Sequence, residues 1–263
     1  DQSSNQSSKE KISALEMPEA IELTYIYNPS ILGLVDAKRV GVENSLNEII
    51  CFLEDDVVLN VKYISEIMIG FEKNASMIGC AGVISNQPNI STLYVFLHNL
   101  FFRGIYFDPR IKICISKSSQ IIVQCDILSG GLSCWRSGVF DAVKFDVKNN
   151  FFMLEDIEFS TRVSRYYSDR LFINKQAKLT HKWSPINRDA HGFRQKTKLK
   201  ESIVFYKKRK TWKGAISGQL LAMCWWFMES MFQSIRLGSL KPLFGFFSGV
   251  REGLKQKIFT ETN

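Results

Sequence analysis

The chain has 263 residues, of which 45% are hydrophobic and 13% aromatic, so it can form one large domain, or a domain with an appendage, around a sizeable core. Six cysteines without a CxxC pair argue against a zinc or disulfide framework and predict reduced, buried thiols of a cytosolic protein. The net charge of +8 is concentrated in residues 194–213, which hold nine basic residues and one acid.

The first half of the chain alternates between helical and strand patterns. We predict a helix over 9–15, a strand over 21–27, a helix over 34–46, a strand over 49–53, a helix from Asn60 to Lys73 and a strand over 77–85. This alternation predicts an α/β sheet with crossover helices.

The apolar run 49–53 leads directly into Glu54, Asp55 and Asp56. Such a run predicts a strand buried on both faces, and acids at its carboxyl end lie where open α/β sheets bind ligands. Three adjacent carboxylates repel one another, so a bound cation is one reason for their proximity. The alternative is a strand that ends in a solvated acidic turn.

The middle of the chain is less regular. Residues 86–119 are rich in aromatics and predict an irregular insertion, either a lid or acceptor-facing loop or a satellite hydrophobic cluster. A strand over 121–125 then precedes Gly130 and Gly131, where the backbone can approach a ligand closely or can simply turn a corner. A short helix is predicted for 139–145.

A second acidic site follows at Glu155 and Asp156, where a helix is predicted to begin. Acids in a first helical turn are ordinary, because the helix dipole favours them. The functional alternative is a carboxylate held at a cleft as a general base. Two short strands are predicted over 171–173 and 177–181, and the second ends at His181.

The C-terminal part, residues 194–263, is predicted to be a separate helical segment that follows a domain of residues 1–193. Its basic stripe precedes apolar stretches, 214–228 and 237–247, that are too short to span a bilayer. This pattern favours peripheral or monotopic attachment to an anionic membrane surface at its cytoplasmic face. The alternative is a helical subdomain that caps the sheet. A nucleic-acid partner is disfavoured, because aromatic and basic residues do not interleave outside the tail.

Four of these segments, in this order and spacing, resemble motifs of the family-2 glycosyltransferases, which have the GT-A fold, a Rossmann-like mixed sheet with flanking helices. Residues 52–56 resemble the strand-end DxD motif, 36–41 the Ala-Arg-Asn-x-Gly helix, 129–136 the acceptor-side segment and 154–156 the ED motif. Lys38 and Arg39 stand where the family usually has Arg-Asn. The resemblance covers residues 1 to about 210.

The resemblance implies an inverting transfer of a sugar from a nucleotide-sugar donor to a hydroxyl of a saccharide or lipid-linked acceptor, in cell-surface polysaccharide synthesis. It assigns a catalytic role to Asp156 as base and to Glu155, donor binding to Asp1, Lys38, Glu54 and Asp55, acceptor binding to Gly130, Gly131 and Trp135, and Mg²⁺ or Mn²⁺ binding to Asp56, Glu54 and His181.

Residues 1–8 resemble a family segment that normally follows a first strand, helix and second strand. We therefore expect a chain shortened at its N-terminus relative to the family, which on its own could lack activity. Two other functions remain open: a nucleotidyltransferase of related fold, and a membrane-associated protein that keeps the fold without turnover.

Overall fold

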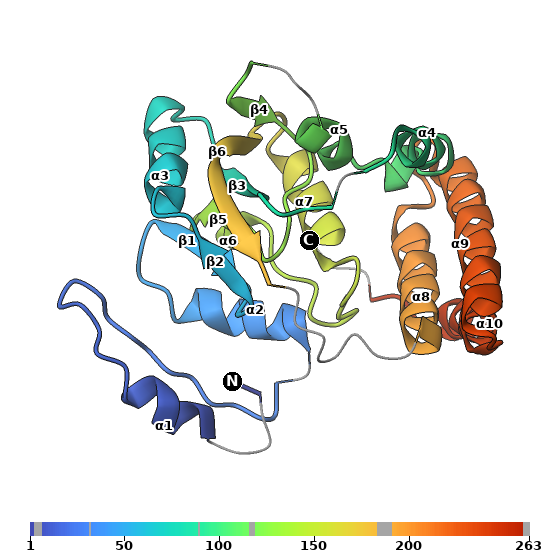
Figure 1. The fold of residues 1–263 in the computed structure, drawn as a ribbon, viewed down its shortest axis with the longest axis horizontal. Coiled ribbons are helices and arrows are strands. Elements are labelled where there is room, and N and C mark those ends of the chain that lie inside the picture. The colour runs from blue at the N-terminus through green and yellow to red at the C-terminus, as the bar shows by residue number, and fades with distance from the viewer. Residues whose placement is uncertain (3–6, 32, 89, 116–118, 183–190, 260–263) are drawn as a thin grey trace.

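The computed structural model describes the chain except residues 3–6, 32, 89, 116–118, 183–190 and 260–263 (Figure 1). Its centre is a mixed sheet with the strand order β1-β5-β3-β6-β2, in which β4 also pairs with β6. β3 and β6 are parallel, and the other described pairings are antiparallel. The strands are β1 (Ile49–Leu53), β2 (Val57–Leu59), β3 (Gly79–Ile84), β4 (Ile122–Gln124), β5 (Leu132–Arg136) and β6 (Leu171–His181).

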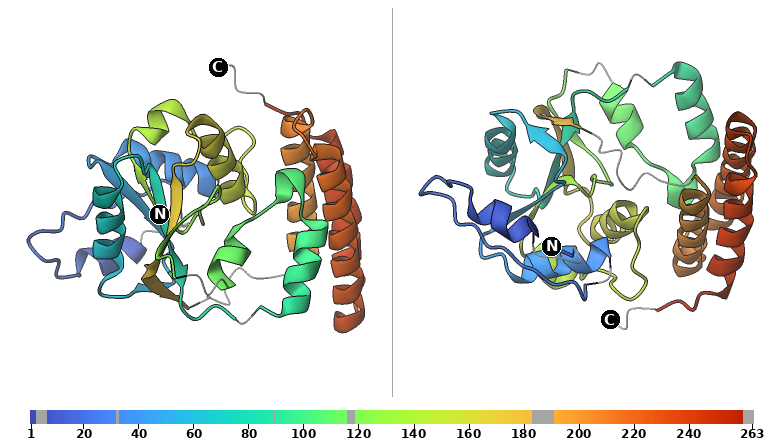
Figure 2. Two further views of the ribbon diagram at one scale, coloured as in Figure 1. Left: turned by 90° about the horizontal axis from the view of Figure 1, so that it is seen from above. Right: turned by 60° about the horizontal axis from the view of Figure 1, so that its bottom comes forward.

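Helices flank the sheet, and the predicted α/β class is confirmed. α3 lies on one side of the sheet and α7 on the other, while three long C-terminal helices stand together at one edge of the molecule (Figures 1 and 2). The helices are α1 (Ser7–Ser13), α2 (Leu34–Glu43), α3 (Tyr63–Lys73), α4 (Thr92–Phe101), the 3₁₀ helix η1 (Gly104–Tyr106), α5 (Arg110–Ile115), α6 (Val139–Ala142), α7 (Glu155–Tyr166), α8 (His191–Arg209), α9 (Ala215–Leu237) and α10 (Lys241–Lys255).

Four sequence predictions about elements are wrong. Residues 21–27 form no strand: their described backbone partners are Asp1 and Pro18, and neither belongs to the sheet. Residues 86–119 contain α4, η1 and α5, and the two short strands expected over 171–181 are one strand, β6. β1 is not buried on both faces, since Cys51 and Leu53 are exposed and Ile50 alone of its five residues is fully buried; among the described strands it pairs only with β5 and so lies at a sheet edge.

The cysteines also differ from expectation. Cys51 and Cys134 form a disulfide, because the antiparallel register of β1 and β5 places them directly opposite each other with Cα atoms 4.1 Å apart. Cys80 and Cys125 are free and buried, as predicted, whereas Cys224 is free but exposed. The pairing could not be read from the sequence, since 83 residues separate the two cysteines.

Two hydrophobic cores hold the fold together. The first lies between the sheet and its flanking helices, with Tyr63, Ile67 and Phe159 among its buried members. The second joins the C-terminal helices to the segment before α7, through residues such as Phe151, Phe205 and Trp226. The second core therefore contains residues from both sides of the boundary predicted at residue 193.

Buried charges reinforce this junction. The carboxylate of Glu158 in α7 contacts Arg162 and, from α8, Lys208 and Arg209. Lys208 also contacts Asp146. Burial alone would raise the pKa of Glu158, but the three cations outweigh it and lower that pKa to about 2. Part of the basic segment 194–213 thus neutralises acids inside the protein.

This cluster predicts a loss of stability in acid. Because the pKa of folded Glu158, about 2, lies below its ordinary value of 4.5, its stabilising contribution is full above about pH 4.5 and disappears as the pH falls towards 2. Glu158→Gln should lower the free energy of unfolding at neutral pH by about 3–5 kcal/mol, since it leaves buried cations unpaired. It should also flatten the pH profile between 4.5 and 2.

Urea unfolding at several pH values measures both effects. Glu72→Gln, at an exposed position of α3, is the matched control and should leave the profile unchanged. A Glu158→Gln profile as steep as that of the wild type would contradict this role of Glu158.

Candidate active site

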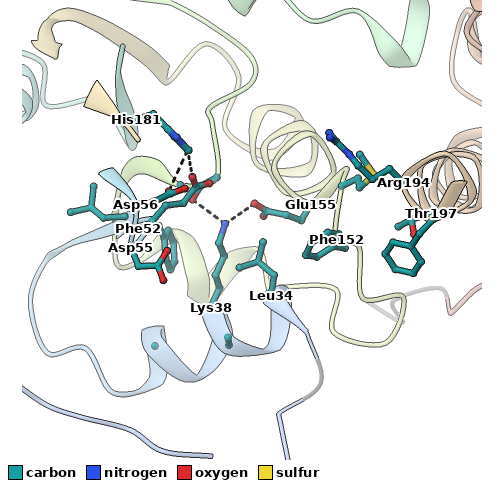
Figure 3. A pocket seen from close by; sticks show the side chains of 18 residues that line it. Leu34, Lys38, Phe52, Asp55, Asp56, Phe152, Glu155, His181, Arg194 and Thr197 are labelled. Carbon is teal, nitrogen blue, oxygen red and sulfur yellow. Dashed lines mark hydrogen bonds and ion pairs between the residues drawn. The ribbon is translucent and has the colours of Figure 1, made fainter. Parts of the chain in front are cut away.

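A cavity of about 1070 Å³ opens at one end of the sheet (Figure 3). Its walls come from α2, the end of β1 and the acids after it, the Gly130–Gly131 segment, the start of α7, the end of β6 and the first turns of α8. Of the residues assigned a site role from the sequence, the cavity is lined by Lys38, Glu54, Asp55, Asp56, Gly130, Gly131, Glu155 and His181. The structure thus brings together residues that are as much as 143 positions apart in the sequence.

Glu54, Asp56 and His181 converge on one side of the cavity. Val57 pairs with His181 in the β2–β6 register, which brings the acids after β1 to the end of β6. His181 Nε2 lies 2.6 Å from a Glu54 carboxylate oxygen and 3.5 Å from Asp56 Oδ1. One ligand atom from each residue lies within 4.8 Å of the others, and two carboxylates with an imidazole are a donor set that suits a divalent cation.

Asn86 fixes the position of His181 from outside this triad. Its side-chain amide donates to the carbonyl oxygen of His181 at 2.8 Å, and its side-chain oxygen accepts from the backbone N–H of His181 at 3.0 Å. Sequence reasoning missed Asn86. It lies two residues after the end of β3, and the parallel pairing of β3 and β6 brings it beside His181.

Lys38 and Glu155 lie beside the triad, and the Lys38 ammonium is drawn between Asp56 and Glu155 in Figure 3. Lys38 Nζ lies 2.7 Å from Glu155 Oε1 and donates to the carbonyl oxygen of Gly130 at 3.0 Å. Both side chains are only 10% exposed. Burial raises the pKa of Glu155, and the Lys38 ammonium offsets part of this rise. Glu155 is therefore a carboxylate at the cavity wall with increased basicity.

The two glycines allow this convergence. A Cβ on Gly130 would overlap the Glu155 carboxylate and crowd Lys38 Nζ, and a Cβ on Gly131 would overlap the side chain of Glu54. The paired glycines therefore serve a close approach of the chain to both acidic residues, and not merely a turn.

We expect Gly130→Ala to lower activity by about tenfold or more, because the methyl group forces Glu155 and Lys38 out of their contact and a displacement of about 1 Å can cost 10²-fold in rate. Steady-state kinetics checks this, with a thermal unfolding curve to show that the fold is kept. Gly138→Ala is the control, because a Cβ there meets nothing within 4 Å. Equal activity of the two variants would contradict the close-approach account.

Asp156, the base assigned from the sequence, is not among the residues that line this cavity. Its Oδ2 lies 2.5 Å from Arg110, and its Oδ1 accepts the backbone N–H of Ile157. Arg110 also pairs with Asp108 and donates to Ser129, and these three residues line a second cavity of about 200 Å³. Asp156 is thus paired with Arg110, and it lines a small hollow of about 10 Å³ together with residues that also line the large cavity.

Two other residues with a predicted site role, Trp135 for the acceptor and Asp1 for the donor, do not line the large cavity. Trp135 is 2% exposed in β5 and packs on Phe140 and Phe159 in the first core, so it cannot contact an acceptor. Its indole N–H donates to Ser133. Asp1 does not line the cavity either, and its carboxylate accepts a hydrogen bond from Tyr25.

Two residues of α8, Glu201 and Arg194, contribute to the site although the sequence analysis gave neither a site role. The buried carboxylate of Glu201 accepts the backbone N–H groups of residues 152, 153 and 154 at 2.8–3.0 Å, which fixes the segment that leads into Glu155. Arg194 lines the cavity beside Thr197. A lone acid inside a basic stripe was the available signal for Glu201.

No family model matches the sequence, and no curated protein matches it. Solved structures that resemble it include GalNAc-T7 with UDP, GalNAc and Mn²⁺, at 14% identity and a TM-score of 0.44, with 77% of this chain and 44% of that chain covered. A mycobacterial protein matches at 12% identity and a TM-score of 0.42, with 75% of this chain and 61% of that chain covered. A mannosyltransferase from Pyrobaculum calidifontis with GDP-Man and Mn²⁺ matches at 8% identity and a TM-score of 0.47, with 86% of this chain and 68% of that chain covered. The chain spans about half of the length of the first two. At these scores the likeness says nothing about the activity or substrate of this chain.

Proposed function

We propose that this chain is a metal-dependent glycosyltransferase that uses a nucleotide-sugar donor. The observation that carries the proposal is one cavity in which a candidate cation site, formed by Glu54, Asp56 and His181, faces the basic carboxylate of Glu155. Displacement of a nucleoside diphosphate by a hydroxyl needs both features, since charge develops on the leaving group and a proton leaves the attacking oxygen.

Glu54, Asp56 and His181 would hold Mg²⁺ or Mn²⁺. Bound there, the ion would neutralise charge on the donor diphosphate. Lys38 also lines the cavity, where its ammonium lies 2.7 Å from Glu155 Oε1 and so holds the proposed base in place. Asp55, exposed at the rim, is placed to accept hydrogen bonds from donor hydroxyls.

The first turn of α7 supplies the base. The sequence assigns that role to Asp156, but the cavity lining and the raised pKa of the neighbouring carboxylate favour Glu155. In this proposal Glu155 accepts the proton of the acceptor hydroxyl as its oxygen attacks the anomeric carbon, and the diphosphate leaves from the opposite face. A single displacement of this kind inverts the configuration. Asp156 positions the turn through its contacts with Arg110.

The finer assignments rest on the motif resemblance. We propose membership of family 2 with a GT-A fold, and a saccharide or lipid-linked acceptor of the kind used in polysaccharide synthesis. Gly130 and Gly131 let Glu155 and Glu54 lie close to the backbone of the proposed acceptor-side segment. The four motifs and their order support this assignment.

Isothermal titration tests the donor class. We expect binding of at least one of the UDP, GDP and dTDP sugars in the presence of Mn²⁺, and loss of that binding with EDTA. Titration with nucleoside triphosphates is the comparison. Binding of triphosphates but of no nucleotide sugar would favour a nucleotidyltransferase, and binding of neither would contradict the proposed donor site.

A further inference from the structure

The outer surface of α9 and α10 carries an apolar stripe. These two helices form the outermost layer of the C-terminal region, with α8 between them and the sheet in Figure 1 and both views of Figure 2. On α9, exposed apolar side chains recur at spacings of four or seven residues, at Ile216, Leu220, Phe227, Met231 and Ile235. Such spacing places them on one helical face.

α10 continues the stripe and adds charge to it. Phe244, Phe247 and Leu254 are exposed, and Arg251 and Lys255 fall on the same helical face at spacings of three and four. Each cation therefore lies beside apolar side chains and not on an opposite, solvated face. We call the outward faces of α9 and α10 the apolar-cationic face.

Cations dominate the exposed charge of α9 and α10. In residues 215–255, all of which the structure describes, the exposed cations are Arg236, Lys241, Arg251 and Lys255. The two acids of these helices, Glu229 and Glu252, pair with Lys198 and Lys196 of α8. Each acid of α9 and α10 is therefore neutralised by a lysine of α8, although the Glu252 side chain is 41% exposed.

This arrangement discriminates between two kinds of partner. A second copy bound through a two-fold axis would bring together two faces whose exposed charges are mostly positive, so few opposite charges could pair across it. An anionic bilayer surface offers an apolar layer beneath a negatively charged headgroup layer, which complements both components of the face. Among the described residues, no helix meets the length and hydrophobicity needed to cross a membrane.

We propose that the apolar-cationic face binds an anionic lipid surface, with α9 and α10 lying in the interface plane. The sequence had placed membrane contact on the basic segment 194–213, but Lys196, Lys198 and Lys208 each pair with an acid of this chain. α8 connects the cavity to this face, because it lines the cavity through Arg194 and packs against both α9 and α10. Binding would thus hold the cavity near the lipid surface.

Vesicle co-sedimentation tests the apolar part. The wild type should sediment with vesicles of phosphatidylcholine and phosphatidylglycerol and not with phosphatidylcholine alone. Leu220→Glu with Ile235→Glu should weaken binding by about 100-fold or more, because two apolar side chains no longer enter the interface. Leu46→Glu with Val61→Glu makes the same charge change at two highly exposed positions elsewhere and should bind as the wild type does.

A second pair of variants tests the charge. Arg251→Gln with Lys255→Gln should lower affinity for anionic vesicles about 25-fold, about fivefold for each cation. Lys62→Gln with Lys73→Gln, on exposed positions at α3, is the control. Three results would overturn the proposal. The control variants could lose as much affinity as the test variants, or the wild type could bind neutral vesicles as well as anionic ones. The wild type could also prove to be a dimer that Leu220→Glu with Ile235→Glu converts to a monomer. These readouts do not depend on catalysis.

Discussion

Replacing Glu155 by Gln should lower the rate of sugar transfer by about 10²–10⁴-fold, the usual contribution of a positioned general base. The amide keeps the size of the side chain but cannot accept the proton of an acceptor hydroxyl. Glu155 faces the cavity, and burial raises the pKa of its carboxylate, so it is the better proton acceptor of the first turn of α7. We expect kcat to fall and metal-dependent donor binding to change by less than tenfold.

Asp156→Asn is the decisive comparison, since it makes the same chemical change one residue away. Asp156 is paired with Arg110 and does not line the large cavity, so we expect a reduction of about tenfold through loss of that contact. The pH profile separates the two roles, because only the base variant should lose the acid limb of kcat. If Asp156→Asn instead abolishes turnover and Glu155→Gln does not, the base is Asp156 and our reading of the geometry is wrong.

The second large effect is expected at the candidate cation site. Asp56→Ala should weaken Mn²⁺-dependent nucleotide-sugar binding by about 100-fold or more, because even outer-shell partners of a metal site are worth 10–100-fold in affinity. Asp56 supplies one of the three converging ligand atoms. Calorimetric titration of Mn²⁺, and of the donor at fixed Mn²⁺, measures the two equilibria separately.

Asp55→Asn is the matched control for this site. Asp55 lines the cavity next to Asp56 but is not part of the triad. We expect it to reduce donor affinity without changing the dependence on Mn²⁺. An Asp56→Ala variant that binds Mn²⁺ and donor as the wild type does would remove the cation site from the account.

The sequence predicts the elements whose cause is local. The apolar run 49–53 gives β1, and the 3.6-residue period gives α2, α3 and α7 within a few residues. β2 was missed because three apolar residues carry no usable period, and it forms by pairing with β6, more than 100 residues away. The helices of 86–119 were missed because apolar side chains occur around much of α4, which hides the helical period.

The site divides in the same way. Motif order predicted that Lys38, Glu54 and Glu155 serve one site, and all three line the cavity. Which carboxylate of α7 faces the cavity depends on helix rotation, and that depends on packing partners such as Glu201, whose contacts are long-range. Trp135 was assigned from the 129–136 motif but is buried, because β5 lies between β1 and β3 and residues 132–135 are all buried.

The central claim is that the cavity binds a divalent cation and a nucleotide sugar together and cleaves the bond to the sugar. Release of nucleoside diphosphate from a panel of nucleotide sugars tests it most directly, measured with Mn²⁺ and with EDTA. The account predicts release from at least one donor with Mn²⁺ alone, and its loss in Asp56→Ala and Glu155→Gln. Release that continues in EDTA, or that both variants retain, would contradict the account.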